Sequence, residues 1–147
     1  MKKQFLTVVI AVLTALPVGV SQARDDHLTF PLADFFARDD VKERLGDEIK
    51  FYFGEQGHPA VASRMGEFQS NKKTNAFNKT DQEACEWALF SAMLSLRDRA
   101  VQLGGDAVVN ITSNYRNSPL SSETEYMCGA GGFVAGVTMK GEVVKFE

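Results

Sequence analysis

The sequence has few of the residues that usually carry metal or nucleophilic chemistry. Its 147 residues include only two cysteines and two histidines. His27 and His58 each stand alone, and neither a CxxC nor an HxxxH pair occurs, so no metal-ligand spacing is present. The GxSxG turn of serine hydrolases is also missing. We therefore expect no metal site, no cofactor and no catalytic residues.

The sequence also has no excess of positive charge. It contains 16 Lys and Arg against 19 Asp and Glu, and without Lys2 and Lys3 the net charge falls to −5. A nucleic-acid-binding module usually carries charge of the opposite sign. We therefore expect no nucleic-acid partner.

The first 23 residues are typical of a secretory signal peptide. Lys2 and Lys3 precede an apolar run over residues 5–16, and a small-residue pattern ends at Ala23. The apolar run is shorter than the about 20 residues that cross a bilayer, and no later run is long enough. No cysteine stands at the cleavage point for lipid attachment. We expect cleavage after Ala23, export to the periplasm or the medium, and no stable membrane insertion afterwards. Residues 24–147 then have the size of one domain.

A long capped helix followed by a buried strand is the central structural prediction. Thr80 and Glu83 form a capping box, in which the Thr80 hydroxyl accepts from the Glu83 N–H and the Glu83 carboxylate reaches back. Gly104 supplies the left-handed residue that ends a helix. We expect a helix over residues 81–103 and a strand over residues 107–115 packed beneath it.

Apolar residues cover most of the surface of this helix, in two stripes. The first stripe is Cys85, Leu89, Ala92, Leu96, Ala100 and Leu103, and the second is Trp87, Phe90, Leu94 and Val101. A helix with so much apolar surface is covered on more than one side. We expect the sheet under one stripe and the N-terminal helical region over the other. Trp87 and Met93 then belong to the core and not to a cofactor site.

The rest of the chain predicts one more helical region and several strands. We expect helix over residues 27–46 with a break near Arg38, strands over 49–53 and 60–69, and a loop over 70–79. In the strand that ends at Tyr115, alternation places Val109 and Ile111 on one face and Val108 and Asn110 on the other. There follow a mobile loop over 116–122, strands over 123–128 and 133–139, a tight turn at Lys140-Gly141 and a strand over 142–146.

These elements predict an α+β fold. It consists of a single antiparallel or mixed β-sheet, the long helix packed on one face, an extra N-terminal helical segment and a C-terminal β-meander.

Cys85 and Cys128 are the only cysteines of the chain. An even number of cysteines in an exported protein favours a disulfide. The alternative is a redox pair, or a reactive Cys85 activated by the helix N-terminus. Because the spacing is not CxxC and both cysteines stand in apolar surroundings, we predict a structural disulfide across the interface of helix and sheet.

The polar run over residues 70–79 is the most unusual surface segment. It concentrates Lys72, Lys73, Asn75 and Lys79 immediately before a helix N-terminus, where N–H groups and the helix dipole favour anions. One interpretation is a solvated loop whose amides satisfy local turns. The other is a contact of these four residues with an anionic envelope component or partner.

Four segments of the sequence resemble a family of small exported bacterial proteins. They are KFYFG, SNKKTNAFNKTDQEAC, LGGDAVVNI and ETEYMCGAGGFVAGVTMKG, and the resemblance covers almost all of residues 24–147. The family has no assigned function, although its members often carry the label "excinuclease ATPase subunit". An ATPase needs a glycine-rich loop that ends in Lys-Ser/Thr, and the nearest segment here, residues 131–138, has no lysine.

The order of long helix, glycine cap, Ala-Val-Val strand and terminal meander has a more distant resemblance. Over roughly the second half of the chain it is similar to the YbjQ-like family of heavy-metal-binding proteins and to the RcsF-like fold. The metal binding implied by the first has no ligand set in this sequence. The further cysteines and the lipid anchor typical of the second are missing, so its signalling role is not implied.

Two functional hypotheses remain. The first is a non-catalytic periplasmic binding or envelope-associated protein, whose partner is an envelope component or a periplasmic protein. The second is a small thiol-dependent redox protein that uses Cys85 and Cys128.

Overall fold

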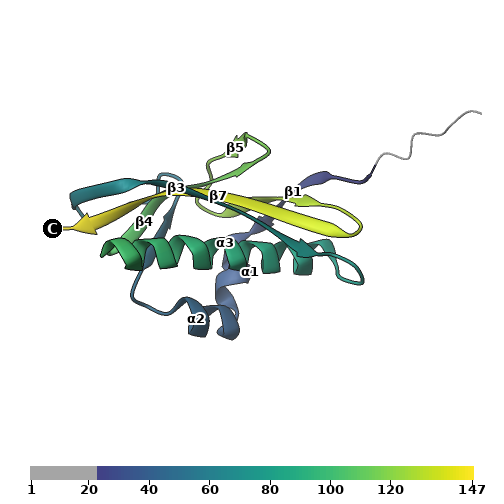
Figure 1. Cartoon of the computed structure of the whole chain (residues 1–147), viewed down its shortest axis with the longest axis horizontal. Coiled ribbons are helices and arrows are strands. Elements are labelled where there is room, and N and C mark those ends of the chain that lie inside the picture. Colours follow the sequence, from purple (N-terminus) through teal and green to yellow (C-terminus); the bar gives the residue numbers. More distant parts are fainter. Residues whose placement is uncertain (1–22) are drawn as a thin grey trace, which may run out of the picture.

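The computed structural model describes residues 23–147, so the predicted signal peptide lies outside the described residues except for Ala23. The elements in chain order are β1 (Asp26–Pro31), α1 (Leu32–Ala37), α2 (Asp39–Leu45), β2 (Lys50–Phe53), β3 (Val61–Asn75), α3 (Asp81–Leu103), β4 (Ala107–Tyr115), β5 (Ser118–Leu120), β6 (Glu125–Ala130) and β7 (Val134–Phe146). The predicted α+β class is confirmed. A mixed sheet carries the long helix α3 on one face, with α1 and α2 beyond it (Figure 1).

The sheet is organised around the long strand β7. One side of β7 pairs antiparallel with β3, and the other side pairs antiparallel with β6 near its start and with β4 further along. β1 joins the outer side of β6, while β2 and β5 pair with β4, β2 in the parallel direction. The predicted turn at Lys140-Gly141 is wrong, because β7 continues through it. Gly141 instead allows close packing, since a Cβ there would lie 2.5 Å from Cγ1 of Val108.

Helix α3 has the predicted bounds, but the predicted return bond from the Glu83 carboxylate to the Thr80 N–H is not among the hydrogen bonds of the described residues. The Glu83 N–H donates to Oγ1 of Thr80 at 3.1 Å, and Gly104 adopts a left-handed φ of 74° after the last turn. The first apolar stripe packs on the sheet, except that Leu103 at its end is exposed. Val101 of the second stripe is also exposed, so the helix is less completely covered than predicted.

The N-terminal region is part strand and part helix. Leu28 and Phe30 alternate with exposed residues in β1, which pairs with β6, so the prediction of helix from His27 is wrong for this segment. The predicted break at Arg38 is confirmed, because its extended ψ of 131° separates α1 from α2. Nη1 of Arg38 donates to Oε2 of Glu86 on α3 at 2.8 Å, which ties the two short helices to the long one.

Two segments predicted as loops are strands. Residues 70–75 continue β3 and pair with residues 134–139 of β7, so only residues 76–80 form the connection to α3. Polar residues are tolerated there because β3 pairs on one side only. Residues 118–120 form β5, joined to β4 by Arg116 and Asn117, which both have positive φ as in a type I′ hairpin turn.

A bulge in β4 changes the face on which its side chains lie. Asn110 has a φ of 51°, and the pairing of β4 with β7 slips directly after Val109. An extra residue in a strand reverses the alternation of side chains. Val108 and Ile111 therefore face α3, whereas Val109 lies in a separate cluster. The prediction that placed Val109 and Ile111 on one face is wrong for this reason.

The predicted disulfide lies in the core between α3 and the sheet. Cys85 on α3 is bonded to Cys128 on β6, with their Cα atoms 5.8 Å apart, and both residues are fully buried. The bond fixes the start of α3 on the sheet. Within residues 23–147, no helix is long and apolar enough to span a membrane.

Candidate functional site

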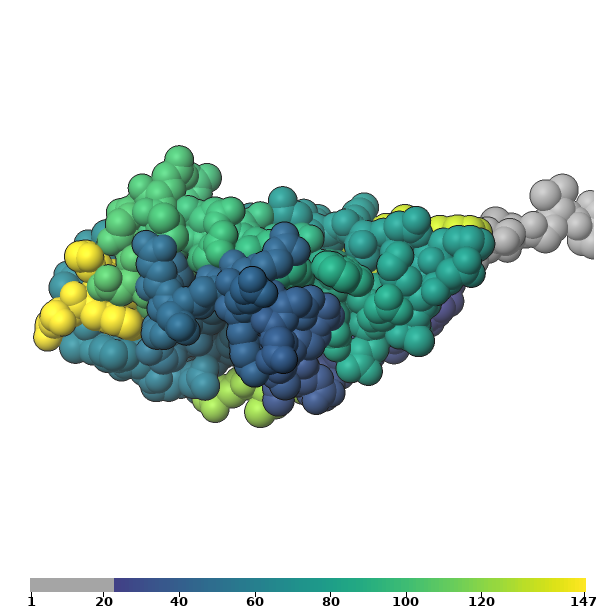
Figure 2. Space-filling model, turned by 90° about the horizontal axis from the view of Figure 1, so that it is seen from below, coloured from purple at the N-terminus to yellow at the C-terminus, as the bar shows by residue number. Residues whose placement is uncertain are grey.

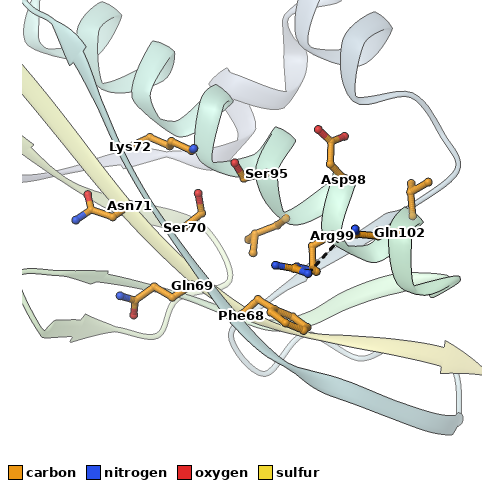
Figure 3. A pocket seen from close by; sticks show the side chains of 11 residues that line it. Phe68, Gln69, Ser70, Asn71, Lys72, Ser95, Asp98, Arg99 and Gln102 are labelled. Atoms are coloured by element: carbon orange, nitrogen blue, oxygen red, sulfur yellow. Dashed lines mark hydrogen bonds between the residues drawn. The ribbon is translucent and has the colours of Figure 1, made fainter.

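An open cleft of about 800 Å³ lies between strand β3 and helix α3 (Figure 3). Ser70 and Lys72 of β3 point toward α3, whereas Gln69 and Asn71 point away, as the alternation of a strand requires. From the helix side the cleft is lined by Ser95, Leu96, Asp98, Arg99, Val101 and Gln102. The residues that form it are therefore a polar row on the strand and the exposed final turns of the helix.

Arg99 is held at one end of this cleft by an aromatic ring. Its guanidinium carbon lies 4.9 Å from the ring centroid of Phe68, in a cation–π contact. Nη1 of Arg99 also donates to Oε1 of Gln102 at 3.2 Å. Both contacts orient the guanidinium, whose remaining N–H groups are left for another acceptor.

Positive charge in the cleft is not neutralised by the neighbouring carboxylate. Asp98 accepts from Nε and Nη2 of Arg97, at 3.0 and 2.7 Å. Lys72 and Arg99 form no ion pair within 4.0 Å with any carboxylate in the described part of the chain. The cleft is therefore locally cationic, although the chain as a whole is negative.

Ser70 adds an unusual hydroxyl to the cleft. The residue is 7% exposed, and its Oγ has no hydrogen-bond partner among residues 23–147. A buried hydroxyl without a partner costs about 1–3 kcal/mol. Ser70 lines the cleft and points toward α3, but its Oγ is itself buried, so the side chain must turn toward the open side of the cleft before an acceptor there can provide the missing partner.

The polar groups of the cleft include hydrogen-bond donors, and they are not arranged for nucleophilic attack by a serine. A nucleophilic serine needs a neighbouring base, and neither Ser70 nor Ser95 bonds to a histidine or a carboxylate in the described chain. The ammonium, the guanidinium and the hydroxyl groups are all donors, and together they suit an anionic group.

The four residues predicted as an anion contact do not lie together. Lys72 faces the cleft, but its neighbour Lys73 lies on the opposite face of the sheet, near Tyr115. Oδ1 of Asn75 accepts from the N–H of Phe77 at 2.8 Å, and Nζ of Lys79 donates to the Asn75 carbonyl at 3.0 Å. Asn75 and Lys79 thus form the local turn that the alternative interpretation described.

Ser70 and Arg99 were missed at the level of sequence. Alternation along residues 68–72 places Ser70 on the same side as Lys72, but this signal appears only if the segment is taken as a strand. The approach of Arg99 to Phe68 joins two separate elements, so no local pattern indicates it.

A second hollow, of about 470 Å³, lies between α1, α2 and β2. Its lining is mainly apolar and includes Leu32, Phe36, Leu45, Ile49 and Phe51. The two lysines at this hollow, Lys42 and Lys50, pair with Asp39 and Asp47 at 3.7 and 3.8 Å. Their charges are compensated, unlike those of the cleft, and no buried polar group without a partner lies in this lining.

The histidines lie in separate places. Nδ1 of His58 lies 2.8 Å from the carbonyl oxygen of Pro59, and the His27 ring lies edge-on to Tyr115. In the described range, no group of three or more His, Cys, Asp and Glu residues is placed to hold a metal ion.

Comparisons with protein-family models, with curated proteins and with solved structures find no match to this chain. The fold and the site define it as a small α+β domain with a disulfide-tied helix and a cationic cleft at the edge of its sheet.

Proposed function

We propose that the protein is a non-catalytic, exported binding protein of the bacterial envelope, and that the cleft between β3 and α3 binds a small anionic ligand. One observation carries the proposal. Among the described residues, Lys72 and Arg99 have no carboxylate partner, and they line the same cleft as the buried hydroxyl of Ser70, which has no hydrogen-bond partner in that range.

The donors suit a carboxylate or a phosphate group. Arg99 is oriented by Phe68 and Gln102 and offers directed N–H groups, whereas Lys72 offers a mobile ammonium. Hydrogen bonds from charged donors to an anion are about twice as strong as neutral ones. Ser70 supplies a directional hydroxyl, which gains a partner when the ligand binds.

The exported location rests on two features. The predicted signal peptide precedes Arg24, and a fully buried disulfide is typical of proteins in oxidising compartments. The resemblance to a family of exported bacterial proteins points to the same location. The partner we propose is an anionic component of the envelope.

The redox alternative has less support. Thiol–disulfide exchange requires a thiolate to reach a disulfide sulfur, and both Cys85 and Cys128 are fully buried. We assign the bond a structural role. It holds α3 on the sheet, and α3 carries one wall of the cleft.

Anion binding is tested by isothermal titration of the purified protein with inorganic phosphate, pyrophosphate and citrate. We expect Lys72→Gln combined with Arg99→Gln to weaken binding of the best anion at least tenfold, about 1.4 kcal/mol, and to flatten its salt dependence. Lys42→Gln is the matched control, since Lys42 is exposed and lies outside the cleft. Binding that is undetectable in the millimolar range, or lost equally in the control, would contradict the proposal.

Ser70→Ala separates binding from stability. Removing a hydroxyl without a partner should leave the free energy of unfolding unchanged or raise it, while the affinity for the anion falls. A substitution that only damages the fold would lower both quantities together. Denaturant unfolding and titration on the same preparation measure the two effects.

The exported location has its own test, which does not depend on the ligand. Mass spectrometry of the exported protein should find Arg24 at the N-terminus. An intact Met1 or a lipid-modified mass would contradict this part of the proposal.

A further inference from the structure

Two turns at one end of the molecule present an exposed apolar surface, which we name the apolar tip. It consists of Phe77, Phe133 and Val134, which are 55%, 73% and 50% exposed. The two phenylalanine rings stack, with centroids 6.0 Å apart and planes 6° from parallel. Exposed large apolar groups that cluster in this way mark a contact surface more often than single exposed residues do.

The apolar tip is held in place by the backbone of both turns. The Ala76 N–H donates to the Phe133 carbonyl at 2.8 Å, which joins the turn after β3 to the turn before β7. Asn75 accepts from the Phe77 N–H, and Asn78 has a left-handed φ of 59°. The fold therefore keeps both rings at the surface in a defined position.

Basic side chains without acidic partners stand beside the apolar tip. Lys73 lines the same shallow hollow as Phe77 and Phe133, and Lys79 lies in the adjoining turn. Neither lysine forms an ion pair with a carboxylate of the described chain. Three acidic residues at this end are paired with arginines, Asp26 and Asp81 with Arg24 and Asp25 with Arg116, whereas Glu83 in the first turn of α3 has no basic partner among the described residues.

The described chain also begins at this end. The carbonyl oxygen of Arg24 lies beside Gly131, where an added Cβ would be 3.0 Å from it, and Arg24 pairs with Asp81 at the start of α3. Figure 1 shows the start of β1, the connection from β3 to α3 and the turn between β6 and β7 at the same end of the molecule.

We propose that the apolar tip docks the protein on the surface of an anionic lipid bilayer. Phe77, Phe133 and Val134 enter the interfacial region, and Lys73 and Lys79 contact the headgroups. Aromatic side chains with flanking basic residues are the combination that favours binding at a membrane surface. The three partly exposed side chains supply far less than the about 800 Å² per partner of a stable protein interface, which argues against a second copy as the occupant.

This surface is distinct from the cleft. Lys73 and Lys72 are neighbours in sequence but lie on opposite faces of the sheet, and the cleft is formed with the later turns of α3. Figure 2 shows the face on the α1 and α2 side, with those helices over its middle and the residues that follow β3 toward one end. A bilayer at that end leaves the cleft open to solution.

The test is flotation of the protein, as exported by cells, with vesicles of phosphatidylglycerol and phosphatidylethanolamine, and with vesicles of phosphatidylcholine alone. We expect binding to the anionic vesicles and a partition coefficient that falls roughly tenfold for each of Phe77→Ser and Phe133→Ser. Lys73→Gln with Lys79→Gln should reduce the anionic preference and its salt dependence. Leu103→Ser, exposed at the other end of α3, and Lys42→Gln are the matched controls and should bind as the unaltered protein does.

Several results would overturn the proposal. These are no binding of the unaltered protein to anionic vesicles, equal binding to both kinds of vesicle, and binding that survives both phenylalanine changes. Light scattering distinguishes a different occupant: a dimer that becomes a monomer in Phe133→Ser would assign the tip to self-association. Because Phe133 is the most exposed of the three residues, Phe133→Ser should keep the melting temperature of the unaltered protein. This single variant therefore remains informative if a variant that combines Phe77→Ser with Phe133→Ser is unstable.

Discussion

The two faces of the sheet differ in how they are covered. On the face toward α3, large side chains such as Leu89, Met93 and Tyr126 belong to one continuous buried cluster. On the opposite face, Val109 and Val144 belong to a small cluster with few neighbours. The comparison indicates that α3 provides most of the apolar burial that stabilises the fold.

A single tyrosine covers part of the opposite face. A Cβ on Gly129 would lie 2.1 Å from Cζ of Tyr115, and Gly136 lies under the same ring. The Tyr115 hydroxyl donates to Asp25 at 3.1 Å, and burial together with this carboxylate raises the pKa of Tyr115. This cover comes from the end of β4 and from the residues just before β1, whereas the other face is covered by a helix of 23 residues.

Loss of the disulfide should have the largest effect, because the bond belongs to the α3 face. The loop joins residues 43 apart, so chain entropy predicts a loss of about 4 kcal/mol in the free energy of unfolding for Cys85→Ser or Cys128→Ser. Denaturant unfolding measures the loss. The double variant should be no less stable than either single one, because the same bond is absent in all three. Two titratable thiols in the untreated protein would show that the bond does not form.

The same substitution on each face tests the comparison directly. Val137 faces α3 and Val109 faces away, and both are fully buried. We expect Val137→Ala to cost about 2–3 kcal/mol and Val109→Ala about 1–2 kcal/mol, because the thinner face can relax around the lost methyl groups. Denaturant midpoints at equal slope give both values. A larger loss of unfolding free energy for Val109→Ala than for Val137→Ala would show that the face away from α3 is the more tightly packed one.

Each face also buries a hydroxyl that has no hydrogen-bond partner among residues 23–147, and removing this hydroxyl should give the smallest effect. Burial raises the pKa of Tyr126 on the α3 face, so its hydroxyl stays neutral at physiological pH. On the other face, Thr138 Oγ1 also has no partner in the described part of the chain. Tyr126→Phe and Thr138→Val should each leave the melting temperature unchanged or raise it by the equivalent of about 1 kcal/mol. A clear fall in either variant would mean that the hydroxyl has a partner in solution.

The sequence by itself determined the elements whose signals are local. The Thr80 cap and Gly104 act within one turn of the helix ends, so the bounds of α3 follow from a few neighbouring residues. Cys85 and Cys128 were the only candidates for a disulfide, and the predicted interface of helix and sheet brings them together. The α+β class followed from the helical period of the apolar residues in 81–103 and from the alternation of apolar and polar residues in the strands.

Only the tertiary structure decided which strand lies beside which. Residues 70–75 and 118–120 have polar sequences typical of loops, and they become strands because β7 and β4 offer backbone partners. At Asn110 the side chains of β4 change the face to which they point, and this change likewise depends on the pairing of β4 with β7.

The candidate site was also predicted only in part from the sequence. Lys72 was identified from the unusual concentration of lysines, but its separation from Lys73 required the strand assignment. Arg99 lies over Phe68, and Ser70 is buried, because α3 packs against β3. The turn between these two elements does not reveal this packing in the sequence. Periodicity records which side chains share a face of one element. It does not show which other element packs against that face. That choice depends on the free energy of burying apolar surface, which only the assembled core determines.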